Sequence, residues 1–344
     1  MDNNDSAKQP LLDVRDLTVE FRTQLGVVKA VNGVNYSVDE GETLAVLGES
    51  GSGKSVTAQA IMGILDTPPG FVTGGEVLFR GRDVLKMSKE DRRKVRGQNI
   101  AMVFQDALSS LNPLFPVGWQ ISEVLRKRKG MNRKDARERA IELMKRVRIP
   151  AAADRVGDYP HQFSGGMRQR IMIAMSIALD PDVLIADEPT TALDVTVQAQ
   201  IMDLLKELQE ERGMGLVLIT HDLGVVADVA DKIAVMYAGR IVESAQVHDI
   251  YRQPAHPYTE GLLASIPRVD MKGQDLAAIK GLPPNLLNLP AGCEFAPRCP
   301  YAMDICRAER PSKQEIVPGR FVTCHRAEEV FHGTAQRANS AGPR

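Results

Sequence analysis

A glycine-rich stretch from Gly48 to Ser55 has the residue types needed to bind phosphate. It reads GESGSGKS and fits the pattern G-x-x-x-x-G-K-S/T, in which backbone N–H groups and a following helix N-terminus surround phosphate oxygens. In this pattern the lysine reaches the β- and γ-phosphates and the serine binds magnesium. A glycine-rich turn without chemical function is the alternative, which the predicted strand before the loop and helix after it disfavour. The candidate nucleotide-binding residues here are Gly48, Ser50, Gly51, Gly53, Lys54, Ser55 and Val56.

Two adjacent carboxylates, Asp187 and Glu188, follow the apolar stretch 183–186. Asp187 could hold magnesium through water, and Glu188 could orient or deprotonate an attacking water molecule. Taken alone, the pair is better explained as the polar end of a buried strand. Together with the phosphate-binding loop, it predicts magnesium-dependent hydrolysis of a nucleotide.

A second candidate phosphate site lies at Ser164, Gly165 and Gly166, directly before a basic helical stretch with Arg168 and Arg170. The N-terminus of that helix could receive a phosphate group. An ordinary helix cap is the alternative explanation of these residues.

The order of predicted elements indicates an α/β fold. Helices and strands alternate from 167 to 220, which predicts a mainly parallel sheet flanked by helices. The helices there are expected at 167–178 and 197–211, and the strands at 183–186 and 216–220. The other predicted elements are an antiparallel layer over 11–21 and 27–47 that ends in a buried strand at 43–47, a helix at 56–65, a hairpin at 75–82, a basic helix at 89–96, a strand at 100–104, a helical stretch at 120–149 and a final β element of the core at 233–242.

These motifs, in this order over roughly 11–267, resemble the ABC ATPase family. The family signature reads L-S-G-G-Q, and here Phe163 and Met167 replace its leucine and glutamine. The resemblance implies a P-loop core with an antiparallel β subdomain and a helical subdomain. It also implies a dimer, because residues 164–166 of one protomer contact the ATP that is held by Lys54 of the other.

The resemblance implies roles for four further residues. Phe21 would stack on adenine, and Gln105 would sense magnesium and the attacking water. Asp194 would link the two protomers, and His221 would contact the γ-phosphate and position the catalytic carboxylate. Each has a plain structural alternative, namely a core phenylalanine, an isolated glutamine, a helix N-cap and a structural histidine. The expected catalytic residues are therefore Glu188, His221 and Gln105, and the expected magnesium ligands are Ser55, Gln105 and Asp187.

A closer resemblance, to the ATPase subunits of oligopeptide/dipeptide permeases, comes from the stretches 159–170, 256–258 and 281–287. It implies that the chain powers import of peptides, together with a second and different ATPase subunit, two transmembrane subunits and an extracellular solute-binding protein. An importer of another small solute, such as a nickel complex, is an alternative. An ABC ATPase in DNA repair or translation is another, although such proteins usually carry a coiled-coil insertion or two ATPase halves. A regulatory module without turnover is disfavoured by the presence of Glu188 and His221.

All four cysteines of the chain fall within residues 293–324. Disulfides are not expected in a reducing compartment, and four thiolates could bind either a zinc ion or an iron–sulfur cluster. The gaps between them are wider than the close C-x₂₋₄-C pairs of structural zinc sites, but spacing leaves zinc open. The resemblance to the permease extension implies a 4Fe–4S cluster on Cys293, Cys299, Cys306 and Cys324, with His325 as a weaker alternative to Cys324.

Composition sets the remaining expectations. The 344 residues carry a formal net charge of −1 and 43% hydrophobic residues, which indicates a globular protein with no global preference for nucleic acid. No apolar stretch is long enough to span a bilayer and residues 1–10 do not resemble a secretory signal, so we expect a cytoplasmic protein. The resemblance to permease ATPases implies that it is peripheral, on the cytoplasmic face of the inner membrane. The expected domains are a flexible N-terminus at 1–10, a nucleotide-binding domain at 11–266 with its helical subdomain at about 106–164, a C-terminal extension with the metal cluster at 267–332 and a disordered tail at 333–344.

Overall fold

The computed structural model describes residues 9–191, 193–266 and 279–340. The chain forms two compact units, each built from segments that are distant in sequence. Unit 1 contains residues 1–13, 37–42 and 77–219, and unit 2 contains residues 14–36, 43–76 and 220–344. Within the described ranges, no helix is long and apolar enough to cross a membrane.

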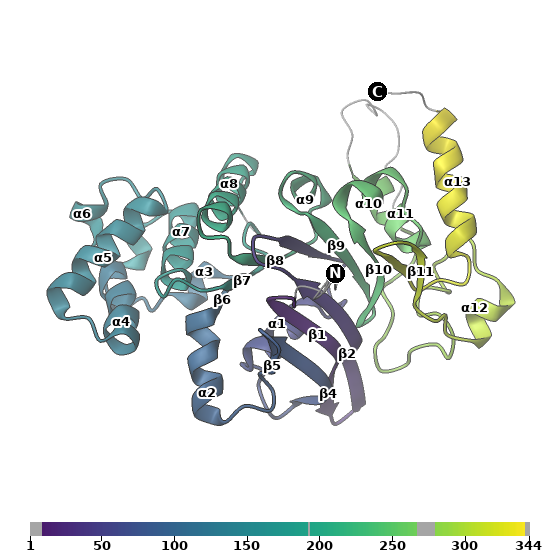
Figure 1. The fold of residues 1–344 in the computed structure, drawn as a ribbon, viewed down its shortest axis with the longest axis horizontal. Coiled ribbons are helices and arrows are strands. Elements are labelled where there is room, and N and C mark those ends of the chain that lie inside the picture. The colour runs from purple at the N-terminus through teal and green to yellow at the C-terminus, as the bar shows by residue number, and fades with distance from the viewer. Residues whose placement is uncertain (1–8, 192, 267–278, 341–344) are drawn as a thin grey trace, which may run out of the picture. The chain divides into compact units, whose positions relative to one another are not determined.

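Unit 1 contains three parallel strands, β6 (Ile100–Val103), β7 (Val183–Asp187) and β8 (Gly215–Thr220). In the register of the pairs, Ile100 lies opposite Val183 and Asp187 lies opposite Ile219. Every residue of these strands is buried, as expected for parallel strands covered on both faces. The chain enters β7 from α7 (Gly165–Ser176) and β8 from α8 (Val195–Arg212) (Figure 1), which confirms the predicted alternation.

The helical part of unit 1 comprises α3 (Ala107–Ser110), α4 (Val117–Lys129), α5 (Arg133–Arg146) and α6 (Ala152–Arg155) (Figure 1). The single helical stretch expected over 120–149 is in fact broken. Gly130 ends α4 with a left-handed backbone (φ 68°), and the Asn132 side chain caps α5 by accepting a hydrogen bond from the Asp135 N–H. Glycine at C′ and asparagine at the N-cap are common helix boundaries. Unit 1 also contains α2 (Lys89–Lys94), a distorted turn Val95–Asn99, the short helix Pro160–Gln162 and β5 (Arg82–Asp83), which pairs with residues 78 and 79.

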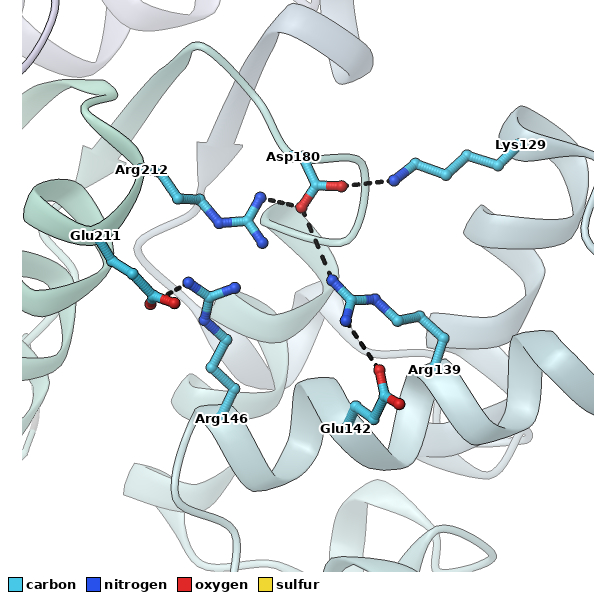
Figure 2. A network of polar contacts seen from close by, with 7 residues as sticks. All are labelled: Lys129, Arg139, Glu142, Arg146, Asp180, Glu211 and Arg212. Carbon is cyan, nitrogen blue, oxygen red and sulfur yellow. Dashed lines mark hydrogen bonds and ion pairs between the residues drawn. The ribbon is translucent and has the colours of Figure 1, made fainter.

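An ion-pair network joins the helical part to the rest of unit 1 (Figure 2). Asp180, in the loop before β7, accepts a hydrogen bond from Lys129 at 2.6 Å and pairs with Arg212 at the end of α8. Arg139 of α5 lies 3.9 Å from the same carboxylate. One carboxylate thus compensates three cations that come from three different helices. The network continues through the pairs Arg139–Glu142 and Arg146–Glu211.

Unit 2 contains most of β1 (Leu12–Thr23), β2 (Gly26–Val38) and β4 (Gly70–Phe79), in the order β2-β1-β4. A second set of strands starts with β3 (Thr43–Leu47), which pairs in parallel with β9 (Lys232–Tyr237). Strand β9 pairs antiparallel with β10 (Arg240–Gln246). The helices of this unit are α1 (Lys54–Met62), α9 (Leu223–Val229), α10 (Val247–Arg252), α11 (Pro257–Ala264), α12 (Asp304–Ala308) and α13 (Ala327–Ser340) (Figure 1).

The C-terminal extension continues the strands of unit 2. We expected the β element at 233–242 to end the core, but β10 pairs antiparallel with β12 (Arg320–Val322), and β12 pairs with β11 (Gln314–Val317). Beneath this junction the Glu243 carboxylate, which is fully buried, accepts a hydrogen bond from Arg320 at 2.7 Å and two more from the Ala255 and His256 N–H groups. The extension is therefore anchored by strand pairing and by a buried ion pair.

Part of the expected disordered tail is helical in the structure. Residues 333–340 lie in helix α13, in a stretch that contains the good helix formers alanine, glutamine and arginine. Residues 341–344 of the expected tail and residues 1–8 of the expected flexible N-terminus lie outside the described residues.

Candidate functional site

The phosphate-binding loop lies in unit 2 between β3 and α1. Helix α1 begins at Lys54, after Gly53, whose backbone is left-handed (φ 105°). The Lys54 side chain folds back along the loop and donates hydrogen bonds to the carbonyl oxygens of Gly48 (2.7 Å) and Glu49 (3.0 Å). Lys54 is only 5% exposed, so the ammonium group is held within the loop instead of extending into solvent.

Two of the loop glycines are required by sterics. A Cβ atom on Gly48 would lie 2.2 Å from the Met236 carbonyl oxygen, and one on Gly53 would lie 2.3 Å from the Ala30 carbonyl oxygen. Both glycines also have a positive φ, which side chains disfavour. The third glycine, Gly51, has a positive φ but open space around it. The backbone of β2 and β9 therefore sets the shape of the loop.

The other predicted ligands of unit 2 have more solvent access. Ser50 is exposed at the tip of the loop, and Ser55 and Val56 are partly buried in the first turn of α1. Phe21 is partly buried near the end of β1. His221 directly follows β8 and is exposed. The adenine and γ-phosphate contacts expected for Phe21 and His221 stay predictions.

The predicted catalytic carboxylate, that of Glu188, lies in unit 1 directly after β7. Its Oε2 atom accepts hydrogen bonds from Gln105 Nε2 and from the Thr191 hydroxyl, both at 2.9 Å. Glu188 itself has a positive φ of 45°, a costly conformation for a non-glycine residue that often occurs at functional sites. Asp187, the last residue of β7, is 4% exposed. The structure thus brings the predicted residues Gln105 and Glu188 into contact and adds Thr191, which no sequence pattern indicated.

The signature residues form the N-terminus of α7, where Ser164 and Gly165 are exposed and Gly166 is partly buried. Ser164 caps the helix by accepting a hydrogen bond from the Met167 N–H at 3.4 Å. A Cβ atom on Gly166 would lie 2.6 Å from Val197 Cγ1 on α8, which explains this glycine by packing. Phe163, which replaces the leucine of the signature, is buried, with the Arg155 guanidinium 4.2 Å above its ring.

Asp194 caps α8 in the structure. Its carboxylate accepts a hydrogen bond from the Val197 N–H at 3.0 Å, and the residue is exposed. The alternative of a helix N-cap therefore accounts for its local geometry. The link between protomers stays a prediction.

The four cysteines line one small cavity in unit 2, together with His256, Tyr301, His325 and Arg326. Burial raises the pKa of the Cys293 thiol to about 11 and that of Cys324 to about 12, which favours protonated thiols in the absence of a bound cation. Within the described residues, no three His, Cys, Asp or Glu side chains are arranged closely enough to hold a metal ion. The ring of His325 shares a hydrogen bond with the Glu309 carbonyl oxygen at 3.0 Å. The structure therefore gathers the predicted ligands around one space without forming a finished metal site.

Comparison with known proteins first defines the class. The ABC transporter family model matches residues 31–191, and the model described as the C-terminal region of oligopeptide/dipeptide transporters matches residues 242–306. The dimeric, post-hydrolysis structure of the ATP-binding cassette MJ0796 bound to ADP and Pi is similar, with a TM-score of 0.62 and 29% identity, and the match covers 69% of this chain and 98% of that one. The protein is an ABC ATPase with the P-loop α/β fold of that class.

Full-length relatives then define the family. The oligopeptide transport ATP-binding protein OppD of Bacillus subtilis is 52% identical over 91% of this chain and 87% of its own length. OppD of Salmonella typhimurium is 50% identical, with coverages of 94% and 96%, and the dipeptide transport ATP-binding protein DppD of Bacillus subtilis is 49% identical, with coverages of 95% and 99%. The chain belongs to the family of oligopeptide/dipeptide transport ATP-binding proteins.

Proposed function

We propose that this ABC ATPase hydrolyses MgATP with Glu188 as the catalytic carboxylate and thereby powers the import of peptides. The observation that carries the site assignment is the pair of hydrogen bonds from Gln105 and Thr191 to one oxygen of Glu188. Both donors hold the carboxylate at the end of a buried strand, next to Asp187. A carboxylate fixed in this way can orient an attacking water and accept its proton.

The remaining nucleotide contacts follow from the two motifs. Lys54 and the N–H groups of the loop bind the phosphates, and Phe21 stacks on adenine. Ser55, Gln105 and Asp187 would hold magnesium, which would supply neutralisation of the charge that develops on the phosphate oxygens. His221 contacts the γ-phosphate.

Hydrolysis requires a second ATPase subunit. Ser164 and Gly165 stand exposed and Gly166 partly buried at the N-terminus of α7, where backbone N–H groups and the helix dipole favour phosphate. We propose that they contact ATP held by the Lys54 position of a related but different subunit, with Asp194 at the boundary between the protomers.

Peptides are the proposed cargo because the relatives named above are oligopeptide and dipeptide transport proteins. Two transmembrane permease subunits would receive the conformational change that ATP hydrolysis drives, at the cytoplasmic face of the inner membrane. An extracellular binding protein would supply the peptide.

The helical part of unit 1 offers a docking surface for a transmembrane subunit, since Leu114 is 77% exposed and the exposed rings of Phe115 and Trp119 stack with their centroids 4.3 Å apart. A crosslink from a cysteine introduced at Ser109 should reach a transmembrane subunit. Crosslinks to soluble proteins alone would favour a non-transport ABC ATPase.

The catalytic assignment is tested by the substitution Glu188→Gln in the assembled complex. The amide keeps the shape of the side chain but cannot accept a proton, so turnover should fall at least about 10²-fold while ATP binding persists and an ATP-bound dimer accumulates. Glu210→Gln is the matched control, because Glu210 is an exposed glutamate on α8 of the same unit. A Glu188→Gln complex that keeps half of the original ATPase rate would refute the assignment.

The cysteine cavity is proposed to hold one 4Fe–4S cluster, with zinc as the alternative. The proposal is supported by the four cysteines that line one small cavity, because four cysteine thiolates are the usual ligand set of such clusters. All nucleotide contacts proposed above lie outside the segment 293–324, so we assign the cluster a structural or docking role, with no part in hydrolysis. Anaerobically purified protein should be brown and contain about four irons and four sulfides per chain. Colourless protein with one zinc ion per chain would establish the alternative.

A further inference from the structure

An ion pair connects the C-terminal extension to the phosphate-binding loop within unit 2. Arg298 donates two parallel hydrogen bonds to the Glu49 carboxylate, from Nη1 to Oε2 at 2.6 Å and from Nη2 to Oε1 at 2.9 Å. The Arg298 side chain is 6% exposed and that of Glu49 is 27% exposed. A paired, largely buried geometry of this kind is the strong form of a salt bridge.

Backbone carbonyl groups of the C-terminal extension hold Arg298 in place. The Arg298 Nε donates a hydrogen bond to the Lys280 carbonyl oxygen at 3.2 Å, and the Arg298 backbone N–H donates to the Phe295 carbonyl oxygen at 2.9 Å, which closes a turn. Arg298 directly precedes Cys299, which lines the cysteine cavity. The guanidinium is therefore positioned by the same turn that positions one of the four thiols.

The Glu49 backbone is also held by hydrogen bonds, one from Lys54 of the loop and one to Tyr258 of α11. Its N–H group donates to the Tyr258 hydroxyl at 2.9 Å, and its carbonyl oxygen accepts from the Lys54 ammonium at 3.0 Å. Tyr258 is fully buried against the rings of Tyr237 and Phe295, with centroids 4.6 and 5.4 Å away. A single loop residue is thus fixed at its N–H, its carbonyl and its side chain, and two of these contacts come from residues 258 and 298.

The ion pair has an electrostatic consequence for a loop that binds a polyanion. The Glu49 carboxylate would repel the phosphates of ATP if its charge were uncompensated, because the partly buried setting screens charges less than water does. The guanidinium of Arg298 cancels that charge in place. Loss of Arg298 would leave the Glu49 carboxylate in the loop without its cation. An uncompensated, partly buried charge is what makes breaking a buried ion pair costly.

We propose that Arg298 is a positioning residue for ATP binding: by holding the Glu49 carboxylate in an ion pair it neutralises that charge, so the C-terminal extension sets the nucleotide affinity. This inference rests on the proposed function in that ATP binds on residues 48–55. Arg298 itself acts on the nucleotide only through Glu49.

The test measures the Kd of ATP for the full-length chain by calorimetry, together with KM and kcat. Arg298→Ala should raise the Kd and the KM at least about tenfold and leave kcat unchanged. Glu49→Gln should bind ATP about as well as the unmodified chain, because it removes the repulsive charge. The double variant Glu49→Gln/Arg298→Ala should recover most of the affinity that Arg298→Ala loses, and Arg298→Lys should be intermediate.

Two controls separate this inference from its alternatives. Arg310→Ala removes another extension arginine, whose partner Glu294 keeps a second cation, Arg240, and should leave the Kd unchanged. Lys54→Ala should abolish tight binding, and its failure to do so would overturn the proposed ATP site itself. If Lys54→Ala loses binding but Arg298→Ala does not, the positioning role is wrong. It is equally wrong if the double variant binds as weakly as Arg298→Ala, because a merely structural defect would not be rescued by neutralising Glu49.

Discussion

Removal of Arg320 tests how the C-terminal extension is anchored to unit 2. Glu243 is fully buried and Arg320 is 2% exposed. The substitution Arg320→Met would keep the aliphatic packing of the side chain and leave the carboxylate without its cation. Breaking a buried ion pair by removing one partner costs about 3–5 kcal/mol.

The structure places the expected loss near the lower end of that range. Two backbone N–H groups, of Ala255 and His256, still donate to the Glu243 carboxylate after the substitution, each at 2.9 Å. The stacking of the Arg320 guanidinium over Phe331 at 5.0 Å is also lost, which adds about 0.5–1 kcal/mol. We therefore expect a loss of roughly 3–4 kcal/mol in the free energy of unfolding.

Urea denaturation followed by circular dichroism measures this loss through the shift of the transition midpoint at constant slope. The exposed pair Arg307–Asp304 in the same extension provides the control, and Arg307→Ala should change the stability by less than about 0.5 kcal/mol. Adding Glu243→Gln to Arg320→Met should recover part of the loss, since a neutral amide carbonyl can still accept from the backbone. A loss below about 1 kcal/mol for Arg320→Met would refute the view that this pair anchors the extension.

Two further predictions concern charge and pH. Asp180→Asn should lower the free energy of unfolding of unit 1 by roughly 1–2 kcal/mol at low salt, because Lys129, Arg139 and Arg212 lose their common anion, and the effect should shrink in 0.5 M NaCl; an equal effect at both salt concentrations would contradict an electrostatic origin. Burial lowers the pKa of His256 to about 3, and its Nδ1 accepts a hydrogen bond from the Tyr258 N–H, so the folded state requires the neutral ring. Since the unfolded chain binds this proton below about pH 6.5, stability should decrease as the pH falls, by about 2 kcal/mol at pH 5. The His256→Gln variant should lose less stability over the same range, and an identical pH dependence would exclude this origin.

Much of the fold could be predicted because the elements are short and strongly patterned. The buried strands at 43–47, 183–187 and 215–220 are continuous apolar runs, and their length and turn boundaries identify them as strands. The break at Gly130 was less visible, because polar residues on both sides continue the helical pattern. The elements of the extension were missed because a strand as short as β12 carries too little pattern, and its pairing with β10 depends on a contact between residues 243 and 322.

The residue types and spacings of the site were determined by the sequence alone. Lys54 within its glycine loop, and the carboxylates at 187 and 188 after an apolar strand, depend on local chemistry that the order of residues specifies. The sequence also indicated that the four cysteines belong together, since they occupy one short segment. The sequence alone did not determine all the contacts that these residues make. Some of their partners, such as Gln105 for Glu188, are distant in sequence, and no local pattern identifies them.

Tertiary structure decided those partners. The hydrogen bonds that hold Glu188 come from Gln105 on another strand end and from Thr191 in the following loop. The ion pair between Glu49 and Arg298 spans 249 positions, and neither residue is exceptional in its own segment. Such contacts form only when the strands and turns that carry them have packed, because the desolvation that makes a buried charge pair consequential exists only in the folded chain.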